Sequence, residues 1–313
     1  MSIPDRTVRP RRSELATPAS NDWMFAKAAA SGADLVFLDL EDACAPAERE
    51  SARGKAATAL RELDWGRTTR AIRMNGVDTR WAHGDVIEVV TGAREALDVI
   101  IVPKVRTARD VWWVDVLLTQ LEETLGLDDR IGLEVLIEET EGLQNVDEIA
   151  RASDRLEAII FGAGDFSASQ AARVDTNFDP LVPYPGDMWH YARARIVVAA
   201  RSAGIDAVDA PFPNYRDPDA YRGAAERAGA MGYNGKWAIH PSQVEIANDV
   251  FAPTADELAR AEAVVAAYRE AEAAGRGATG LDGMLVDAAH LRHAANITAT
   301  ADLLGLRHGG EDS

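Results

Sequence analysis

The feature that most constrains this chain is the alternation of short apolar runs with longer helical patterns, from near the amino terminus to about residue 241. Strands that alternate with helices imply βαβ units and a parallel sheet. Eight such units in about 240 residues predict a (β/α)8 TIM barrel. A doubly wound sheet is the alternative, which is disfavoured because no GxGxxG motif follows the first run. The eight runs are SELATP, DLVFLDL, TRAIRMN, DVIIVPKV, RIGLEVLIE, LEAIIFGAG, GIDAVDAP and KWAIHP.

The character of the chain changes after the eighth run. Residues 254–274 predict a strong helix, in which Thr254 is the N-cap and Glu257 completes a capping box. A GRGATG break and the stretch LDGMLVD follow, and a last helix is expected from about Ala288 to Leu304. This tail is too small to be an independent domain. We therefore expect a catalytic barrel domain over 1–250 and a helical lid or intersubunit arm over 251–313.

Charge and composition exclude several classes of function. The 33 basic and 51 acidic side chains give a formal charge of −18, which argues against nucleic-acid binding. No apolar stretch approaches the roughly 18 residues that cross a bilayer, so no membrane segment is expected. The single cysteine, Cys44, allows no internal disulfide, and the first residues lack the apolar core of a secretory signal. These features favour a cytoplasmic protein.

Polar residues follow the apolar runs at nearly every carboxyl end. In a TIM barrel these ends converge on one mouth, where the active site is built from several loops. No matching concentration of polar residues occurs at the amino ends of the runs. The polar residues are Asp39, Glu41, Asp42, Arg73, Asn75, Lys104, Glu138, Asp165, Asp209 and His240.

Glu138 and Asp165 are the best metal candidates, because each comes where a strand-like run ends. Two carboxylates that leave room for water and substrate suit a catalytic Mg²⁺. The competing interpretations are that Glu138 only stabilises a helix amino terminus and that Asp165 is an N-cap before FSASQAA. Gly162 and Gly164 favour the site, since glycine lets the backbone approach a ligand closely.

Arg73 lies in the apolar run TRAIRMN, where a buried guanidinium needs an anionic partner. That partner is a structural carboxylate, such as Asp39 or Glu41, or a substrate carboxylate or thioester oxygen. The cluster 39–42 could orient metal-bound waters, or Asp42 could cap the next helix. Lys104 raises the possibility of Schiff-base chemistry, although the metal pair already supplies an electron sink.

The motifs along most of the chain, from Arg11 to Asn296, resemble the citrate-lyase-β-like (HpcH/HpaI aldolase) superfamily and most closely its malyl-CoA and β-methylmalyl-CoA lyases. The resemblance implies a TIM barrel, Mg²⁺ or Mn²⁺, and reversible cleavage of a 3-hydroxyacyl-CoA of malyl, β-methylmalyl or citramalyl type. The products are an acyl-CoA and a 2-oxo acid such as glyoxylate. The motifs are SGADLVFLDLEDACAP, IRMNGVDT, VPKV, EVLIEETEGLQNVDEIA, FGAGDFSAS, GKWAIHPSQVEIANDVF and LDGMLVDAA.

The resemblance also implies a role for particular residues. Glu138 and Asp165 correspond to metal ligands, and Arg73 corresponds to a substrate-binding arginine. Asp287, in the motif GMLVD, corresponds to a catalytic acid/base supplied by a neighbouring subunit, within trimers that pair into hexamers. The residues expected to line the coenzyme A cofactor site are Lys27, Gly164, Ile239 and His240.

Two stretches depart from the lyase pattern. The lyases tend to have a Phe-Gly-Pro-Gly-Ser-Arg-like stretch where this chain has 16–21, ATPASN, so an aromatic and a basic contact to coenzyme A are missing. The segment after FGAGDFSAS is shorter and different, which leaves the exact acyl-CoA and oxo acid open. Three alternatives follow: a malyl-CoA thioesterase, a metal-dependent aldolase acting on free hydroxy acids, and a non-catalytic acyl-CoA-binding barrel.

Overall fold

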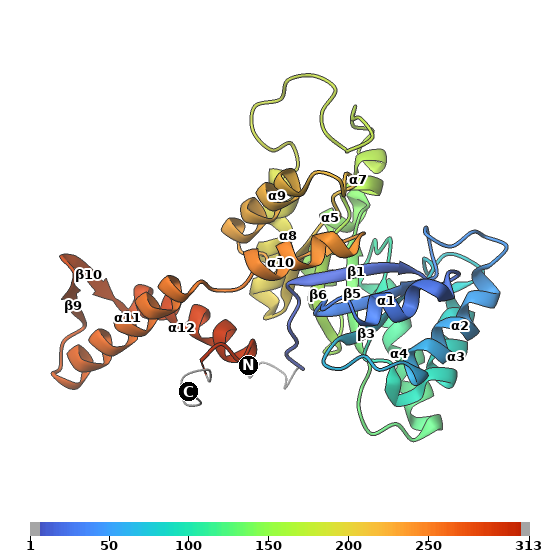
Figure 1. Cartoon of the computed structure of the whole chain (residues 1–313), viewed down its shortest axis with the longest axis horizontal. Helices are drawn as coiled ribbons and strands as arrows, with labels where there is room; N and C mark the ends of the chain where they lie inside the picture. Colours follow the sequence, from blue (N-terminus) through green and yellow to red (C-terminus); the bar gives the residue numbers. More distant parts are fainter. Residues whose placement is uncertain (1–6, 308–313) are drawn as a thin grey trace. The chain divides into compact units, whose positions relative to one another are not determined.

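The computed structural model describes residues 7–307 (Figure 1). Contacts between Cα atoms divide the chain into two compact units, Met1–Phe251 and Ala252–Ser313. Each is described by itself below. In the described part of the chain, no helix combines the length and the apolarity that a membrane crossing requires.

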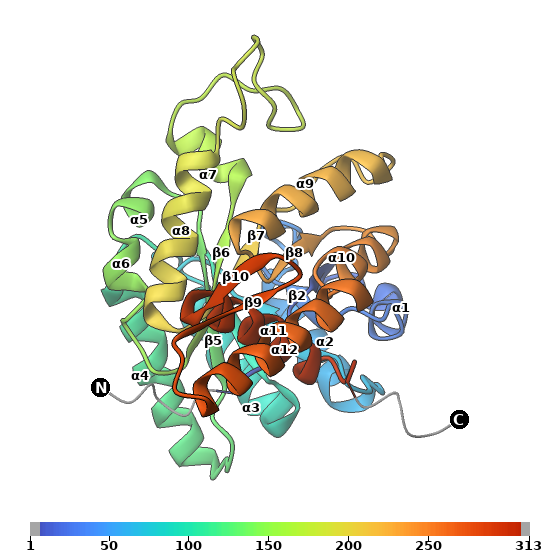
Figure 2. The same cartoon turned by 90° about the vertical axis from the view of Figure 1, so that its left-hand side faces the viewer.

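The first unit is a closed barrel of eight parallel strands, paired in the order β1 to β8 with β8 closing on β1. Each of the eight predicted runs overlaps one strand, so the predicted TIM barrel is confirmed. Figure 2 shows the helices arranged around the strands. The strands are β1 Ser13–Pro18, β2 Leu35–Asp39, β3 Thr69–Arg73, β4 Val99–Val102, β5 Gly132–Ile137, β6 Leu156–Phe161, β7 Asp206–Asp209 and β8 Gly235–Ala238.

The helices of this unit alternate with the strands. Several begin and end where the sequence supplies a cap: Thr107 and Asp110 form a capping box at the start of α4, and Gly126 ends it in the left-handed conformation. The α-helices are α1 Phe25–Ala29, α2 Arg49–Glu62, α3 Ala82–Ala93, α4 Ala108–Leu125, α5 Thr140–Gln144, α6 Val146–Ile149, α7 Ala163–Ser169, α8 His190–Ala203, α9 Pro218–Met231 and α10 Val244–Val250. The short 3-10 helices are η1 Asp22–Met24, η2 Arg94–Ala96 and η3 Pro241–Gln243.

Two apolar layers hold the barrel together. Alternate residues of each strand point inward or outward, so Leu35 and Phe37 join the interior cluster while Val36 and Leu38 pack beneath the helices. Trp237 fills the interior against Phe37, with ring centroids 4.5 Å apart. Because both faces of each strand are covered, the strands have the near-continuous apolar sequences of buried parallel strands.

One buried ion network ties α8 to the barrel wall. Asp209, at the end of β7, accepts hydrogen bonds from Arg193 Nε at 2.8 Å and from Lys236 Nζ at 2.6 Å. Burial by itself would raise the pKa of Asp209, but the two cations outweigh it and lower the pKa to about 2. Asp209 therefore stabilises the fold above its ordinary pKa of 3.8, and this contribution is lost as the pH falls toward 2.

Replacing Asp209 with asparagine is expected to lower the free energy of unfolding by about 3–5 kcal/mol at pH 7, because it leaves two buried cations without their anion. Urea unfolding monitored by circular dichroism measures this. The variant should also lose less stability than the native chain between about pH 4 and pH 2. Asp219→Asn, at an exposed position in α9, is the control. Identical pH profiles for Asp209→Asn and the native chain would contradict the assignment.

The second unit is a pair of helices with a β-hairpin between them. The helices are α11 Ala255–Ala273 and α12 Ala288–Leu303, and the hairpin strands β9 Ala278–Leu281 and β10 Met284–Asp287 pair antiparallel. The predicted capping box is confirmed: Thr254 Oγ1 accepts from the Glu257 backbone N–H, and Glu257 reaches back to Thr254. Gly305, with φ at 70°, follows the last helix as expected.

Candidate active site at the carboxyl end of the barrel

Glu138 and Asp165 follow neighbouring strands, β5 and β6. Glu138 comes directly after β5 and is 3% exposed. Asp165 lies in the first turn of α7, and its side chain is 42% exposed. The N-cap of α7 is Gly162, so the interpretation of Asp165 as an N-cap is wrong. A Cβ on Gly162 would lie 2.5 Å from Glu138 Cβ, which shows that this glycine is needed for the close packing of the two loops.

Arg73 already has a protein partner. At the end of β3 its Nε and Nη2 donate to the two carboxylate oxygens of Asp39, at 2.8 and 2.6 Å, and its Nη1 lies 3.1 Å from Glu41 Oε2. The structural partner considered from the sequence is therefore present. Burial opposes the charge, but Asp39 outweighs it and raises the pKa of Arg73, so the guanidinium stays charged. Asp39 in turn has a lowered pKa despite its burial, because Arg73 and the backbone N–H groups of Glu41 and Ala43 stabilise its charge.

Lys104 joins the loops that follow β2, β4 and β6. Its Nζ donates to Glu41 Oε1 at 2.6 Å and lies 3.5 Å from Asp42 Oδ1 and 3.6 Å from Asp165 Oδ2. Its backbone N–H donates to Glu138 Oε1 at 2.9 Å, from a left-handed conformation with φ at 53°. Partial burial opposes the charge, but the acidic neighbours outweigh it and raise the pKa of Lys104. The amine is therefore charged, whereas Schiff-base chemistry requires a neutral amine.

The mouth holds more negative than positive charge. Burial, the nearby Glu41 carboxylate and Asp165 raise the pKa of Glu138 well above its usual range, and Arg73 and Lys104 only partly oppose this. Burial likewise raises the pKa of Glu41 to about 6, against the effect of Arg73. The ion pairs and hydrogen bonds above bring five carboxylates together with two cations in the described structure: Asp39, Glu41, Asp42, Glu138 and Asp165, with Arg73 and Lys104.

This donor set fits a divalent metal ion of the Mg²⁺ type. In residues 7–307 no three His, Cys, Asp or Glu side chains form a ready-made metal cluster. Mg²⁺ does not need one, since it is commonly held by one or two carboxylates and keeps waters or substrate oxygens in its other positions. A divalent metal ion, added to Arg73 and Lys104, would also reduce the excess of negative charge at the mouth. Glu138 and Asp165 remain the residues predicted to hold it.

The positions predicted for coenzyme A lie on different elements of the barrel unit. Lys27, on α1, and Ile239, after β8, are exposed. His240 is also exposed, and its Nδ1 lies 2.8 Å from Ser242 Oγ while its ring stacks on Tyr215. Gly164 packs against Phe178, whose ring would lie 3.0 Å from a Cβ at this position.

Asp287 ends β10 in the second unit and is the N-cap of α12. Its Oδ1 accepts from the backbone N–H groups of Ala289 and His290 and lies 2.7 Å from His290 Nδ1. Hydrogen bonding with His290 lowers the pKa of Asp287, so it is a carboxylate at neutral pH. Its side chain is nevertheless exposed, and the outer oxygen, Oδ2, has no hydrogen-bond partner in the described chain.

The sequence alone underestimates the contribution of Glu41 and Lys104 to the site. From the sequence, Glu41 is expected as a possible partner of Arg73 or as one of several acceptors around a metal, and Lys104 only as a weak Schiff-base candidate. In the structure they form a partly buried ion pair that links Arg73 to both metal candidates. The signal available in the sequence was the lysine at the end of a strand in VPKV, in a chain whose positive charge is mostly arginine.

The chain is similar to several known proteins. Residues 12–241 match the family model described as HpcH/HpaI aldolase/citrate lyase. The L-malyl-CoA/beta-methylmalyl-CoA lyase of Cereibacter sphaeroides is 41% identical over 310 residues, covering 96% of this chain and 98% of the relative. The (3S)-malyl-CoA thioesterase of C. sphaeroides is 34% identical over 95% of this chain and 96% of the relative. The structure of CitE from Mycobacterium tuberculosis in complex with magnesium, acetoacetate and coenzyme A is 29% identical, with a TM-score of 0.72, and covers 93% of this chain and 97% of that one.

Proposed function

The chain belongs to the HpcH/HpaI aldolase/citrate lyase family, and from this premise we propose that it is a Mg²⁺-dependent carbon–carbon lyase acting on coenzyme A thioesters. It cleaves a 3-hydroxyacyl-CoA of the malyl, β-methylmalyl or citramalyl type into an acyl-CoA and a 2-oxo acid such as glyoxylate. The observation that carries the proposal is the mouth itself, where Glu138 interacts electrostatically with the charged Arg73 and with Asp165, and Asp165 lies 3.6 Å from the Lys104 ammonium group. The identity of 41% to a lyase over 96% of this chain supports the same reaction.

At the mouth, one set of residues would bind the metal ion and another would stabilise the negative charge of the substrate. Glu138 and Asp165 would hold Mg²⁺, which when bound supplies Lewis acidity toward the oxygens of the oxo acid. Two hydrogen bonds to Asp39 fix the guanidinium of Arg73 through its Nε and Nη2 atoms. The third nitrogen, Nη1, now faces Glu41 and is the atom proposed to meet the negative charge of the substrate. Cleavage moves the electron pair of the broken carbon–carbon bond onto the acyl-CoA fragment as a thioester enolate. A fixed, desolvated cation stabilises such developing charge without reorganising.

Asp287 is proposed as the group that moves the proton at the acyl-CoA α-carbon. In the condensation direction its carboxylate removes a proton from the α-carbon. In the cleavage direction it first takes up, through solvent, the proton that the 3-hydroxyl group of the substrate releases, and then donates this proton to the enolate carbon. Its exposed Oδ2 has no hydrogen-bond partner in the described chain, which leaves one oxygen for this transfer. On this proposal the second unit completes the site of a neighbouring subunit in a homotrimer or homohexamer. Lys27 and Ile239 contribute to the coenzyme A surface.

A product assay tests this function. With malyl-CoA and Mg²⁺, the purified protein is expected to release glyoxylate and acetyl-CoA in equal amounts, and removing the metal with EDTA should abolish the release. The oxo acid is followed as its phenylhydrazone and free coenzyme A by its thiol. Thiol release without oxo acid would show a thioesterase instead. Equal cleavage of free hydroxy acids would show an aldolase that does not use coenzyme A.

A further inference from the structure

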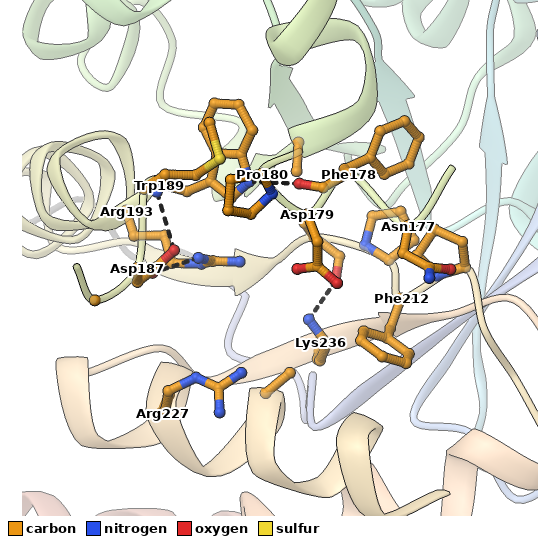
Figure 3. Close-up of a pocket in the computed structure, with 17 residues that line it drawn as sticks. Asn177, Phe178, Asp179, Pro180, Asp187, Trp189, Arg193, Phe212, Arg227 and Lys236 are labelled. Carbon is orange, nitrogen blue, oxygen red and sulfur yellow. Dashed lines mark hydrogen bonds and ion pairs between the residues drawn. The ribbon is translucent and has the colours of Figure 1, made fainter. Parts of the chain in front are cut away.

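A cavity of about 390 Å³ is lined by side chains other than the charged groups of the mouth (Figure 3). Its walls come from Ala163 at the start of α7, from the segment between α7 and α8, from α8 and α9, from the loop after β7, and from β8. The metal candidates and Arg73 are not among its lining residues. Its volume is in the range of small-molecule sites. The proposed lyase chemistry does not use this cavity.

Two of the charged groups in its wall are already satisfied by the protein. Lys236 Nζ donates to Asp209 at 2.6 Å and to the Ala210 carbonyl at 2.6 Å. Arg193 donates to Asp209 and to Asp187, at 2.8 and 2.5 Å. These groups form a rigid polar wall whose charges balance one another. They therefore do not determine the charge of an occupant.

Three other polar side chains in the lining have no hydrogen-bond or ion-pair partner in the described structure. They are the guanidinium of Arg227, the carboxylate of Asp179 and the amide of Asn177. Figure 3 shows Arg227 on α9 at one side of the cavity, with Asn177 and Asp179 on the segment across from it. An unpaired cation thus faces the cavity separately from an unpaired anion and an amide.

The remaining surface is apolar and aromatic. Phe178, Trp189 and Phe212 line the cavity, and Trp189 also donates its indole N–H to the Phe178 carbonyl at 3.3 Å. A ligand that matches this lining needs a negative group, a separate positive group and an apolar body. Asp179 and Arg227 are exposed to solvent, and a ligand that carries both charges pairs with both of them, whereas a simple carboxylate or a simple amine pairs with only one.

We propose that this cavity is a second binding site, for a free α-amino acid with an apolar side chain. Arg227 pairs with the carboxylate of the ligand, and Asp179 with Asn177 receives its ammonium group, through charge-assisted hydrogen bonds. The aromatic rings cover the side chain. This inference does not depend on the proposed lyase reaction.

Isothermal titration of the full chain with L-phenylalanine, and separately with L-leucine, tests the site. At least one should bind saturably, and 3-phenylpropionate and 2-phenylethylamine, which each lack one charge of phenylalanine, should bind at least about tenfold more weakly. Arg227→Met is expected to weaken amino-acid binding at least about tenfold. The matched control is Arg222→Met on the same helix, because Arg222 pairs with Asp249 and does not line the cavity.

A second variant separates this site from the mouth. Glu138→Gln should bind the amino acid as the native chain does, whether or not the lyase assignment is correct. The proposal is overturned if neither amino acid binds saturably below about 10 mM. It is also overturned if Arg227→Met binds as tightly as the native chain, or if Glu138→Gln abolishes the binding.

Discussion

Replacing Glu138 with glutamine is expected to abolish Mg²⁺ binding and to slow cleavage of the coenzyme A thioester by about a thousandfold or more, the equivalent of at least about 4 kcal/mol of transition-state stabilisation. Glutamine keeps the shape of the side chain and an oxygen that can accept from the Lys104 backbone N–H. It removes only the charge that a metal requires. Isothermal titration with Mg²⁺ and the product assay measure the two effects.

The same substitution should leave the fold intact. Burial and neighbouring carboxylates raise the pKa of Glu138, so the charged form is unfavourable in the folded protein. A neutral side chain at this position relieves that cost, and the free energy of unfolding should stay the same or increase. The matched control is Glu139→Gln, one residue further, where the carboxylate lies 3.7 Å from Arg106 and is not proposed to bind metal. A Glu138→Gln protein with native metal affinity and native rate would refute the metal assignment.

The barrel was predictable because buried parallel strands appear in the sequence as short, uninterrupted apolar runs. β2 and β4 are apolar on both faces, and each is read as an uninterrupted run. β1 contains the fully buried Glu14 and is less apolar than the other strands. It was still predicted as one of the eight strands, because the runs that follow it in the sequence set the spacing of the βα units. The boundaries of the capped helix α11 were equally accessible, since Thr254 and Glu257 form a local motif.

The organisation of the mouth could not be read from the sequence in the same way. The position of a charged residue at a strand end follows from the strand pattern, but its partner depends on which loops meet in space. Lys104 illustrates this, because its ammonium group connects the loops that follow β2 and β6. Its backbone also adopts a left-handed conformation, which the residue type does not predict. Similarly, the sequence left open whether Arg73 binds Asp39 or a substrate, and only the structure shows the two hydrogen bonds to Asp39.

Replacing Asp287 with asparagine is expected to reduce turnover by about 10²–10⁴-fold and to spare Mg²⁺ binding, because an amide cannot carry the proton that the α-carbon exchanges. The helix should survive, since asparagine is as good an N-cap as aspartate. Deuterium exchange of the acetyl-CoA methyl group in the presence of an oxo acid measures the proton transfer directly. Asp282→Asn, in the turn of the same hairpin, is the matched control and should exchange at the native rate.

Mixed oligomers test whether Asp287 acts on a neighbouring subunit. Glu138→Gln chains lack the metal ligand but keep a native Asp287, and Asp287→Asn chains have the opposite defect. If the arm of one subunit completes the mouth of another, refolding the two inactive variants together creates some sites with both groups intact, and activity returns. If Asp287 served only its own chain, every site in the mixture would lack one group and the mixture would stay inactive. Each inactive variant alone provides the baseline. Activity that returns on mixing and depends on the mixing ratio would show that the site is shared between subunits.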